Sequence, residues 1–302
     1  RLDALKLLSP MSPARFPASS DASPTSTSAV SSPAQPGLSD GAPTSKEWLL
    51  TDGRGGYACG TAAGIATRRY HGLWIARPRG TAERRMIVSG LEERIGPARQ
   101  IGGSDDWPSA AVMSAHWKDL EAPSPGAGEA LFLRRPLPIW TFATEFGVVD
   151  RSISLQRQEH GQAPALLVRW RNRSQHAVRL RVRPLLGWCN VDHLPPADES
   201  FDDTVTAKGA SWGFRPTAEL PHLWMTCDGV AAFEGESAWY RGFLYAADRL
   251  RGYDHVGDRW SPGVLEMDLA AGQEATVGFA LEEPCASPGA ACDAQLAAAT
   301  RG

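Results

Sequence analysis

The chain has 302 residues, of which 42% are hydrophobic and 22% are charged, and its formal net charge is -3. This composition is that of a globular protein, and it excludes collagen-like and wholly disordered chains. Because the net charge is negative and the sequence pI is near 6.2, the chain has no general attraction to nucleic-acid phosphates or anionic membranes, and we expect neither as a partner.

The cysteines and histidines follow no metal-binding or disulfide pattern. The five cysteines are an odd number without a Cys-x-x-Cys pair, and the seven histidines show no His-Glu-x-x-His or His-x-His spacing. No signal-peptide core is visible, and no apolar stretch approaches the ~20 residues of a membrane span. We therefore expect no metal, no cofactor and a cytoplasmic location.

The chain begins with a segment, residues 1–46, that is rich in Ser, Pro, Thr and Ala and has almost no aromatic residue. Such a segment cannot bury enough surface to offset its chain entropy, so we expect a disordered tail. Since the chain starts at Arg1 and ends abruptly at Gly302, we also expect a fragment of a longer gene product.

From Trp48 onward, short aromatic and β-branched runs are bounded by Gly, Pro, Asp and Asn, which is typical of strands and turns. Apolar and polar residues alternate most strictly at 178–183, 152–156 and 265–269, so each of these strands should bury one face. Other strands are predicted at 73–76, 86–91, 139–146, 165–172 and 223–227.

These elements predict an all-β fold, a large antiparallel β-sandwich, because many short strands follow one another without helices. Residues 265–269 and 275–281 should form a hairpin. The stretches 189–204 and 240–262 should be long rim loops that carry binding groups. We expect the tail to end at residue 46, the sandwich to span 47–284, and the Ala-rich residues 285–302 to be a linker running into a helix.

A glycine-rich turn follows the first predicted strand. Gly53, Gly55 and Ala58 match a G-x-G-x-x-A dinucleotide fingerprint, which requires a helix directly after the turn. Gly60 and Gly64 would break that helix, so the segment predicts a tight turn with glycines at positive φ.

Two segments are dense in groups that bind sugars. Residues 67–72 contain two arginines, a tyrosine and a histidine just before a strand, and residues 239–263 are rich in Tyr, Trp, Asp and Arg. Such groups suit sugar hydroxyls and the apolar faces of glucose rings. The sequence leaves alternatives open: an ion-paired strand entry for the first segment and a loop packed on its own aromatics for the second.

A glycosidase needs two carboxyl groups held across the scissile bond. The adjacent acids of this chain point to opposite faces if they lie on strands, so we expect them to be solvated surface groups. These pairs are Glu92 and Glu93, Asp105 and Asp106, Asp202 and Asp203, and Glu282 and Glu283.

Several runs together resemble the N-terminal domain of glycogen debranching enzymes of the bacterial and archaeal type. The runs are Glu-Trp-Leu-Leu-Thr-Asp-Gly-Arg-Gly-Gly-Tyr-Ala at 47–58, Gly-Thr at 60–61, Thr-Arg-Arg-Tyr-His-Gly-Leu at 67–73, and shorter matches at 91–93, 183–186, 239–240 and 261–264. The matches keep their order from Glu47 to Glu283. The family usually has Asn where this chain has Asp52, and a carboxylate cannot donate a hydrogen bond there.

This resemblance implies a β-supersandwich placed ahead of a helical (α/α)₆ barrel that is absent from this chain. In such enzymes the barrel is the amylo-α-1,6-glucosidase, a glycoside hydrolase that cleaves branch points of glycogen. The sandwich, not catalytic by itself, is expected to help bind glycogen or branched α-glucan oligosaccharides. The expected substrate-binding residues are Asp52, Arg54, Arg68, Arg69, Tyr70, His71, Tyr240, Asp248, Arg249, Tyr253 and Trp260.

Two other functions fit the same residues. The chain could be a stand-alone carbohydrate-binding adaptor, or a purely structural domain that docks the catalytic barrel and touches no sugar. Affinity for glycogen distinguishes these from each other, since only the adaptor should bind it tightly alone.

Overall fold

The computed structural model describes residues 44, 46–78, 83–98, 107–156 and 163–301, which all belong to one compact unit. The predicted disordered tail lies outside these residues, except for positions 44 and 46. The first ten strands are β1 (Glu47–Thr51), β2 (Tyr57–Thr61), β3 (Gly72–Ala76), β4 (Arg85–Pro97), β5 (Ala110–Ala111), β6 (Glu129–Leu133), β7 (Ile139–Thr144), β8 (Gly147–Gln156), β9 (Ala165–Asn172) and β10 (Val178–Asn190). The remaining elements are β11 (Val205–Lys208), β12 (Ser211–Phe214), β13 (Leu223–Asp228), β14 (Ala231–Glu234), β15 (Ala238–Leu244), α1 (Ala246–Leu250), β16 (Val256–Ser261), β17 (Val264–Leu269), β18 (Glu274–Leu281) and α2 (Pro288–Arg301).

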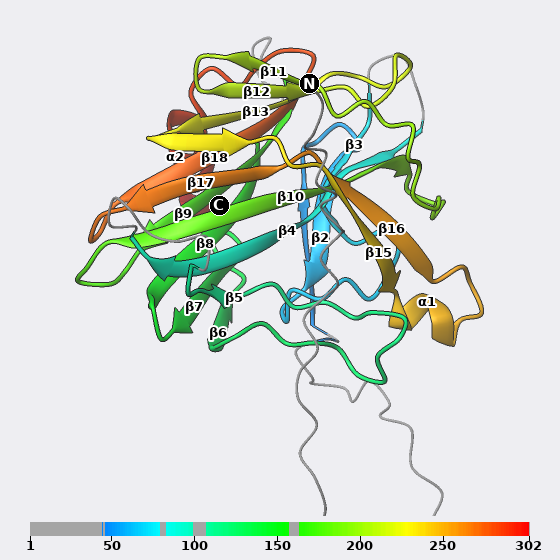
Figure 1. Cartoon of the computed structure of the whole chain (residues 1–302), viewed down its shortest axis with the longest axis horizontal. Coiled ribbons are helices and arrows are strands. Elements are labelled where there is room, and N and C mark those ends of the chain that lie inside the picture. Colours follow the sequence, from blue (N-terminus) through cyan, green and yellow to red (C-terminus); the bar gives the residue numbers. More distant parts are fainter. Residues whose placement is uncertain (1–43, 45, 79–82, 99–106, 157–162, 302) are drawn as a thin grey trace, which may run out of the picture. The chain divides into compact units, whose positions relative to one another are not determined.

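The strands form two sheets, which confirms the all-β sandwich (Figure 1). The first sheet runs β1-β2-β3-β4-β10-β16-β15, with β17 also paired to β10, β14 paired to β17, and β5 paired to β4. The second runs β11-β12-β13-β18-β9-β8-β7-β6. The pairings described for both sheets are antiparallel.

The hydrophobic core lies between the two sheets, and the alternating strands explain why. Val178, Leu180 and Val182 of β10 are buried in this core, while the arginines between them point to the outer face. β9 is buried on both faces, because Leu166 and Val168 enter the core while its other face is covered by a helix.

The predicted hairpin of residues 265–269 and 275–281 is wrong. β17 pairs with β10 and β14 in the first sheet, whereas β18 pairs with β13 and β9 in the second. The turn between them therefore crosses from one sheet to the other. Alternation could not reveal this, because two strands that bury one face each look alike whether they pair or face each other across a core.

The predicted rim loop at 240–262 is also wrong in most of its length. β15 and β16 pair as a hairpin, and the short helix α1 lies at its tip (Figure 1). The other predicted loop, 189–204, contains no helix or strand after β10 ends at Asn190.

The Ala-rich end forms helix α2, which packs on the outer face of the second sheet. Cys292 of α2 is buried against Ala165, Leu167 and Ala280. Arg169 fixes the helix by donating to Asp293 Oδ1 at 2.7 Å. The helix therefore explains why Ser154 and Gln156, predicted to be on a polar face of β8, are buried as well.

Candidate functional site

The first candidate region, residues 47–73, is divided into two separate ends. β1 and β2 form a hairpin whose turn is residues 52–56, and the loop containing residues 67–71 lies beyond the opposite end of β2. Five strand residues separate the two ends by roughly 16 Å. The turn therefore does not present the side chains of residues 68–71, although both segments were expected to contribute to one site.

At the turn end, Asp52 accepts two backbone hydrogen bonds. Its Oδ1 accepts the N–H of Arg54 at 2.7 Å and that of Gly56 at 2.9 Å. Gly53 (φ 78°) and Gly55 (φ 98°) adopt the left-handed conformation that glycine allows. A tight turn is confirmed, and it leads into a strand rather than the helix of a dinucleotide site.

Asp52 and Arg54 also line an open groove of about 1200 Å³. Trp74 of β3 and the exposed residues Glu282 and Glu283, which follow β18, contribute to its walls. Asp52 is only 5% exposed, so Arg54 is the more accessible of the two. The structure thus places these two predicted site residues apart from the others.

At the open end, Glu47 connects the first strand to the 67–71 loop. Its Oε1 accepts a hydrogen bond from Arg68 Nε at 2.7 Å and lies 3.3 Å from His71 Nε2. The Arg68 guanidinium lies 5.8 Å from the centroid of the Tyr70 ring. An ion-paired arginine, one of the alternatives for this segment, is therefore present.

His71 is held as a neutral imidazole. It is 2% exposed, and its Nδ1 accepts the backbone N–H of Thr67 at 3.2 Å, so Nε2 carries the proton toward Glu47. Burial lowers the pKa of His71 to about 4, although the Glu47 carboxylate opposes this shift. Burial raises the pKa of Glu47, but the hydrogen bond from the charged Arg68 and the contact with His71 bring it below its usual value.

The two candidate regions meet at α1, although they are far apart in the sequence. The backbone N–H of Arg69 donates to Asp248 Oδ2 at 2.6 Å, and the N–H of Ala247 donates to the carbonyl of Thr67 at 2.9 Å. Asp248 is 2% exposed, and its carbonyl accepts the N–H of Tyr253 at 3.0 Å. Asp248 therefore positions both segments rather than facing solvent.

The two joined turns carry four side chains that are exposed or partly exposed, and we name these the paired-turn surface: Arg69, Tyr70, Arg249 and Tyr253. Tyr253 is 54% exposed, and the Arg69 guanidinium lies 5.4 Å from its ring centroid. Arg249 is exposed and Tyr70 is partly exposed. The surface combines aromatic faces with guanidinium donors.

Tyr240 and Trp260, the remaining predicted site residues, do not belong to this surface. Tyr240 donates a hydrogen bond to Glu92 Oε2, and its pKa is raised by burial and by that carboxylate. Trp260 is 2% exposed and packs in the core, 5.7 Å from the ring of Phe201. We therefore assign Trp260 to the core, because its ring has no free face for a sugar.

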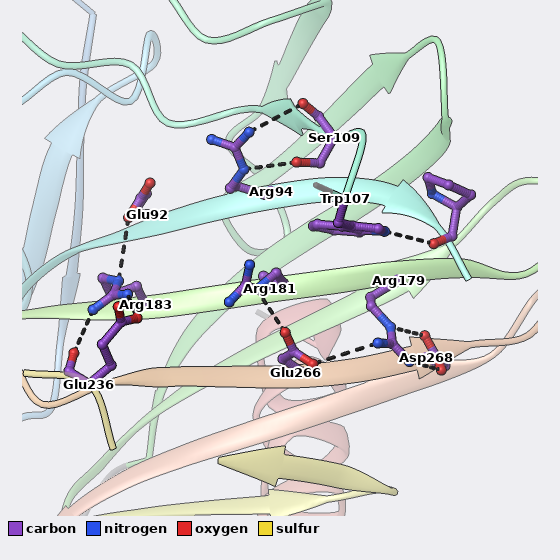
Figure 2. A network of polar contacts seen from close by, with 11 residues as sticks. Glu92, Arg94, Trp107, Ser109, Arg179, Arg181, Arg183, Glu236, Glu266 and Asp268 are labelled. Atoms are coloured by element: carbon purple, nitrogen blue, oxygen red, sulfur yellow. Dashed lines mark hydrogen bonds and ion pairs between the residues drawn. The ribbon is translucent and has the colours of Figure 1, made fainter. Parts of the chain in front are cut away.

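The neighbour of Tyr240, Glu92, belongs to a charged network on the outer face of the first sheet (Figure 2). Arg183 lies between Glu92 and Glu236, with Nη2 2.7 Å from Glu236 Oε2. Arg179 donates to both carboxylate oxygens of Asp268, at 2.7 and 2.6 Å. The opposite charges are paired here, so this face has no excess of positive charge.

Glu93 corrects the prediction that all the acidic pairs are solvated. It is 1% exposed, and its carboxylate accepts Arg151 Nη1 at 2.5 Å and Trp170 Nε1 at 2.6 Å between the two sheets. Glu92 points to the other face, as strand alternation requires. Asp202, Asp203, Glu282 and Glu283 are exposed as predicted, and Asp105 and Asp106 lie outside the described residues.

Two contributions to this region were missed by sequence reasoning. Glu47 begins the family-like run but was not chosen as a site residue. Tyr245 and Arg259 line a cavity of about 110 Å³ together with His71, and Arg259 Nη2 donates to Tyr245 Oη at 2.5 Å. Arg259 lies between Asp258 and Trp260 in β16, so no local pattern marked it as buried.

Among the described residues, neither a metal-ligand cluster nor a membrane-spanning helix is present. No group of three or more His, Cys, Asp or Glu residues there is arranged to hold a metal ion. No helix there has the length and apolarity needed to cross a bilayer.

The comparison with known families agrees with the resemblance seen in the sequence. A family model described as glycogen debranching enzyme N terminal matches residues 46–103 and 127–276. The match includes the β1–β2 turn, the 67–71 loop and α1, and it stops before α2. A comparison with curated proteins found no match. Because the family match covers more than half of the 302 residues, the chain belongs to the family of glycogen debranching enzyme N-terminal domains.

Proposed function

We propose that this domain recognises α-glucan for a glycogen debranching enzyme, and that the paired-turn surface is where the glucan binds. The observation that carries the proposal is the junction of the 67–71 loop with α1. Arg69 and Asp248, which are 179 residues apart, are joined by a partly buried hydrogen bond, and the two segments together expose arginine and tyrosine side chains.

The chemistry of this surface suits a neutral sugar chain. Arg69 and Arg249 provide directional N–H donors for glucose hydroxyls, and the exposed ring of Tyr253 can cover the C–H face of a glucose unit. Arg69 lies beside that ring, so it restricts the ring to a few orientations. A partly ordered platform loses less side-chain entropy when it binds a ligand.

Hydrolysis is assigned in this proposal to a separate (α/α)₆ barrel of the same polypeptide. The adjacent acids Glu92 and Glu93 point to opposite sheet faces, and Glu93 is occupied by Arg151 in the core. Glu92 and Glu93 therefore cannot act together as the two carboxyl groups that a glycosidase holds across one scissile bond. The proposal includes a cytoplasmic location, which is supported by five free thiols, since thiols stay reduced there.

Affinity electrophoresis of the whole chain in gels containing glycogen tests the proposal. Arg69→Ala and Tyr253→Ala should each weaken binding roughly tenfold, which corresponds to about 1.4 kcal/mol. Arg171→Ala is the matched control, because Arg171 is also an accessible arginine, 52% exposed, but lies on β9 of the other sheet.

Three results would count against the proposal. If the chain binds no glycogen, the paired-turn surface docks the barrel instead. Equal losses for Arg69→Ala and Arg171→Ala would show that binding depends on general charge. Unchanged affinity in both tyrosine and arginine variants would place the glucan elsewhere on the domain.

A further inference from the structure

Arg259 of β16 carries a buried positive charge. The residue is 2% exposed, and in the described part of the chain no carboxylate forms an ion pair with it. Its Nη1 donates to the carbonyl of Asp258 at 2.7 Å and its Nη2 donates to Tyr245 Oη at 2.5 Å, and both acceptors are uncharged. An arginine keeps its charge when it is buried, so this charge has to be compensated by another group.

The groups beside Arg259 place no negative charge in contact with it. The carboxylate of Asp258, the preceding residue, accepts the backbone N–H of Gly242 at 2.8 Å instead. Burial raises the pKa of the Tyr245 phenol and the pKa of the Cys189 thiol, although the positive charge of Arg259 lowers both. The phenol and the thiol therefore stay protonated and neutral near pH 7.

Arg259 and Tyr245 both line the cavity of about 110 Å³, and each has a hydrogen-bond donor without an acceptor among the described residues. Arg259 Nε is buried without a partner, and the Tyr245 hydroxyl, which accepts from Nη2, donates its own proton to no described group. The described residues that line the cavity include no aspartate or glutamate, and its other arginine, Arg151, is paired with Glu93. The lining reaches the surface at Gly64, which is exposed and gives a route of entry.

We propose that this cavity binds a small monovalent anion of the halide class, such as chloride, between the Arg259 guanidinium and the Tyr245 hydroxyl. One positive charge without an ion pair is compensated by one negative charge. A cavity of about 110 Å³ is below the ~300 Å³ of pockets for larger organic ligands, so an ion fits where a sugar does not. The Tyr245 carbonyl accepts the N–H groups of Asp248 and Arg249 at 3.1 and 3.0 Å, so the anion also stabilises the start of α1.

Thermal unfolding of the whole chain at constant ionic strength tests the site. Replacing sodium isethionate, whose anion is too large for the cavity, by sodium chloride should raise the Tm by roughly 4 °C, the shift for a tenfold stabilisation of the folded state. Arg259→Met should abolish this shift, because it removes the buried charge. Arg183→Met is the matched control: Arg183 is paired with Glu92 and Glu236 on the outer face of the first sheet, so this variant should keep the chloride shift.

Two further measurements do not depend on the folding of the methionine variant. Crystals of the unmodified chain soaked in sodium bromide should show an anomalous peak within hydrogen-bond distance of Arg259 and Tyr245. Tyr245→Phe, which keeps the arginine and removes one donor, should weaken the chloride affinity roughly tenfold. Equal Tm values in chloride and isethionate, a chloride shift that persists in Arg259→Met, or a cavity without bromide would each overturn the proposal. Such results would mean that water and more distant acids such as Asp248 compensate the charge.

Discussion

The two ends of the β1–β2 hairpin are stabilised in different ways. At the turn end, Asp52 accepts the N–H groups of residues two and four positions later in the chain. At the open end, the 67–71 loop depends on Glu47 of β1 and on Asp248 of α1. The first end is a local structure that its own residues specify, whereas the second exists only when distant elements are assembled.

The largest expected effect is at the junction with α1. Asp248→Ala removes a buried carboxylate and leaves the N–H of Arg69 without its acceptor, so it should destabilise the fold by about 3 kcal/mol. Asp248→Asn keeps an acceptor oxygen and should cost about 1 kcal/mol. Urea unfolding measures both, and Arg249→Ala, an exposed neighbour, should change stability by less than about 0.5 kcal/mol.

The second prediction concerns acid sensitivity at the same end. Because the pKa of His71 is lowered to about 4 in the folded state, the unfolded chain takes up a proton below about pH 6.5 that the folded chain does not. The contribution of His71 to the free energy of unfolding should therefore be constant above pH 6.5 and fall by about 2–3 kcal/mol toward pH 4. Below that pH both states bind the proton, so this contribution no longer changes.

His71→Asn should reduce this fall, because the variant side chain does not titrate. The test is the free energy of unfolding measured by urea between pH 4 and 7. Identical pH profiles for the variant and the unmodified chain would show that His71 is not the neutral, buried group described above.

The third prediction concerns the local turn. Asp52→Ala should cost about 1–2 kcal/mol, because two backbone donors lose their acceptor and the N–H of Gly56 is buried. Asp52→Asn should be nearly silent, since an amide oxygen can accept the same bonds. A large loss for the asparagine variant would mean that the negative charge, and not the hydrogen-bond geometry, stabilises the turn.

The smallest expected effect is that of Arg54, and it tests whether the glucan binds at the turn end or at the open end of the β1–β2 hairpin. Arg54→Ala should change stability by less than about 0.5 kcal/mol, because Arg54 is exposed. If the paired-turn surface binds the glucan, Arg54→Ala should also leave glycogen affinity unchanged. A loss as large as that of Arg69→Ala would instead assign the glucan to the groove beside the turn.

Local patterns in the sequence predicted much of the fold. Alternation at 178–183 and the runs at 165–172 and 223–227 gave strands at the right places, because side-chain burial repeats every two residues in a sheet. Gly53 and Gly55 predicted the turn, because the positive φ that glycine allows is also a local property of the chain. Alternation also separated Glu92 from Glu93, although it could not say that the inward face of β4 contains a buried ion pair.

Tertiary structure alone decided the rest. No local pattern distinguishes a hairpin from a crossing between sheets, so the arrangement of β17 and β18 was predicted wrongly. The roles of His71, Asp248 and Trp260 depend on burial by elements far away in the chain. Residue types and order were enough to identify the family, but partners 179 residues apart determine which of those residues face solvent. The residue type determines which chemical groups a side chain can bind, whereas the assembled sheets determine whether a ligand can reach that side chain.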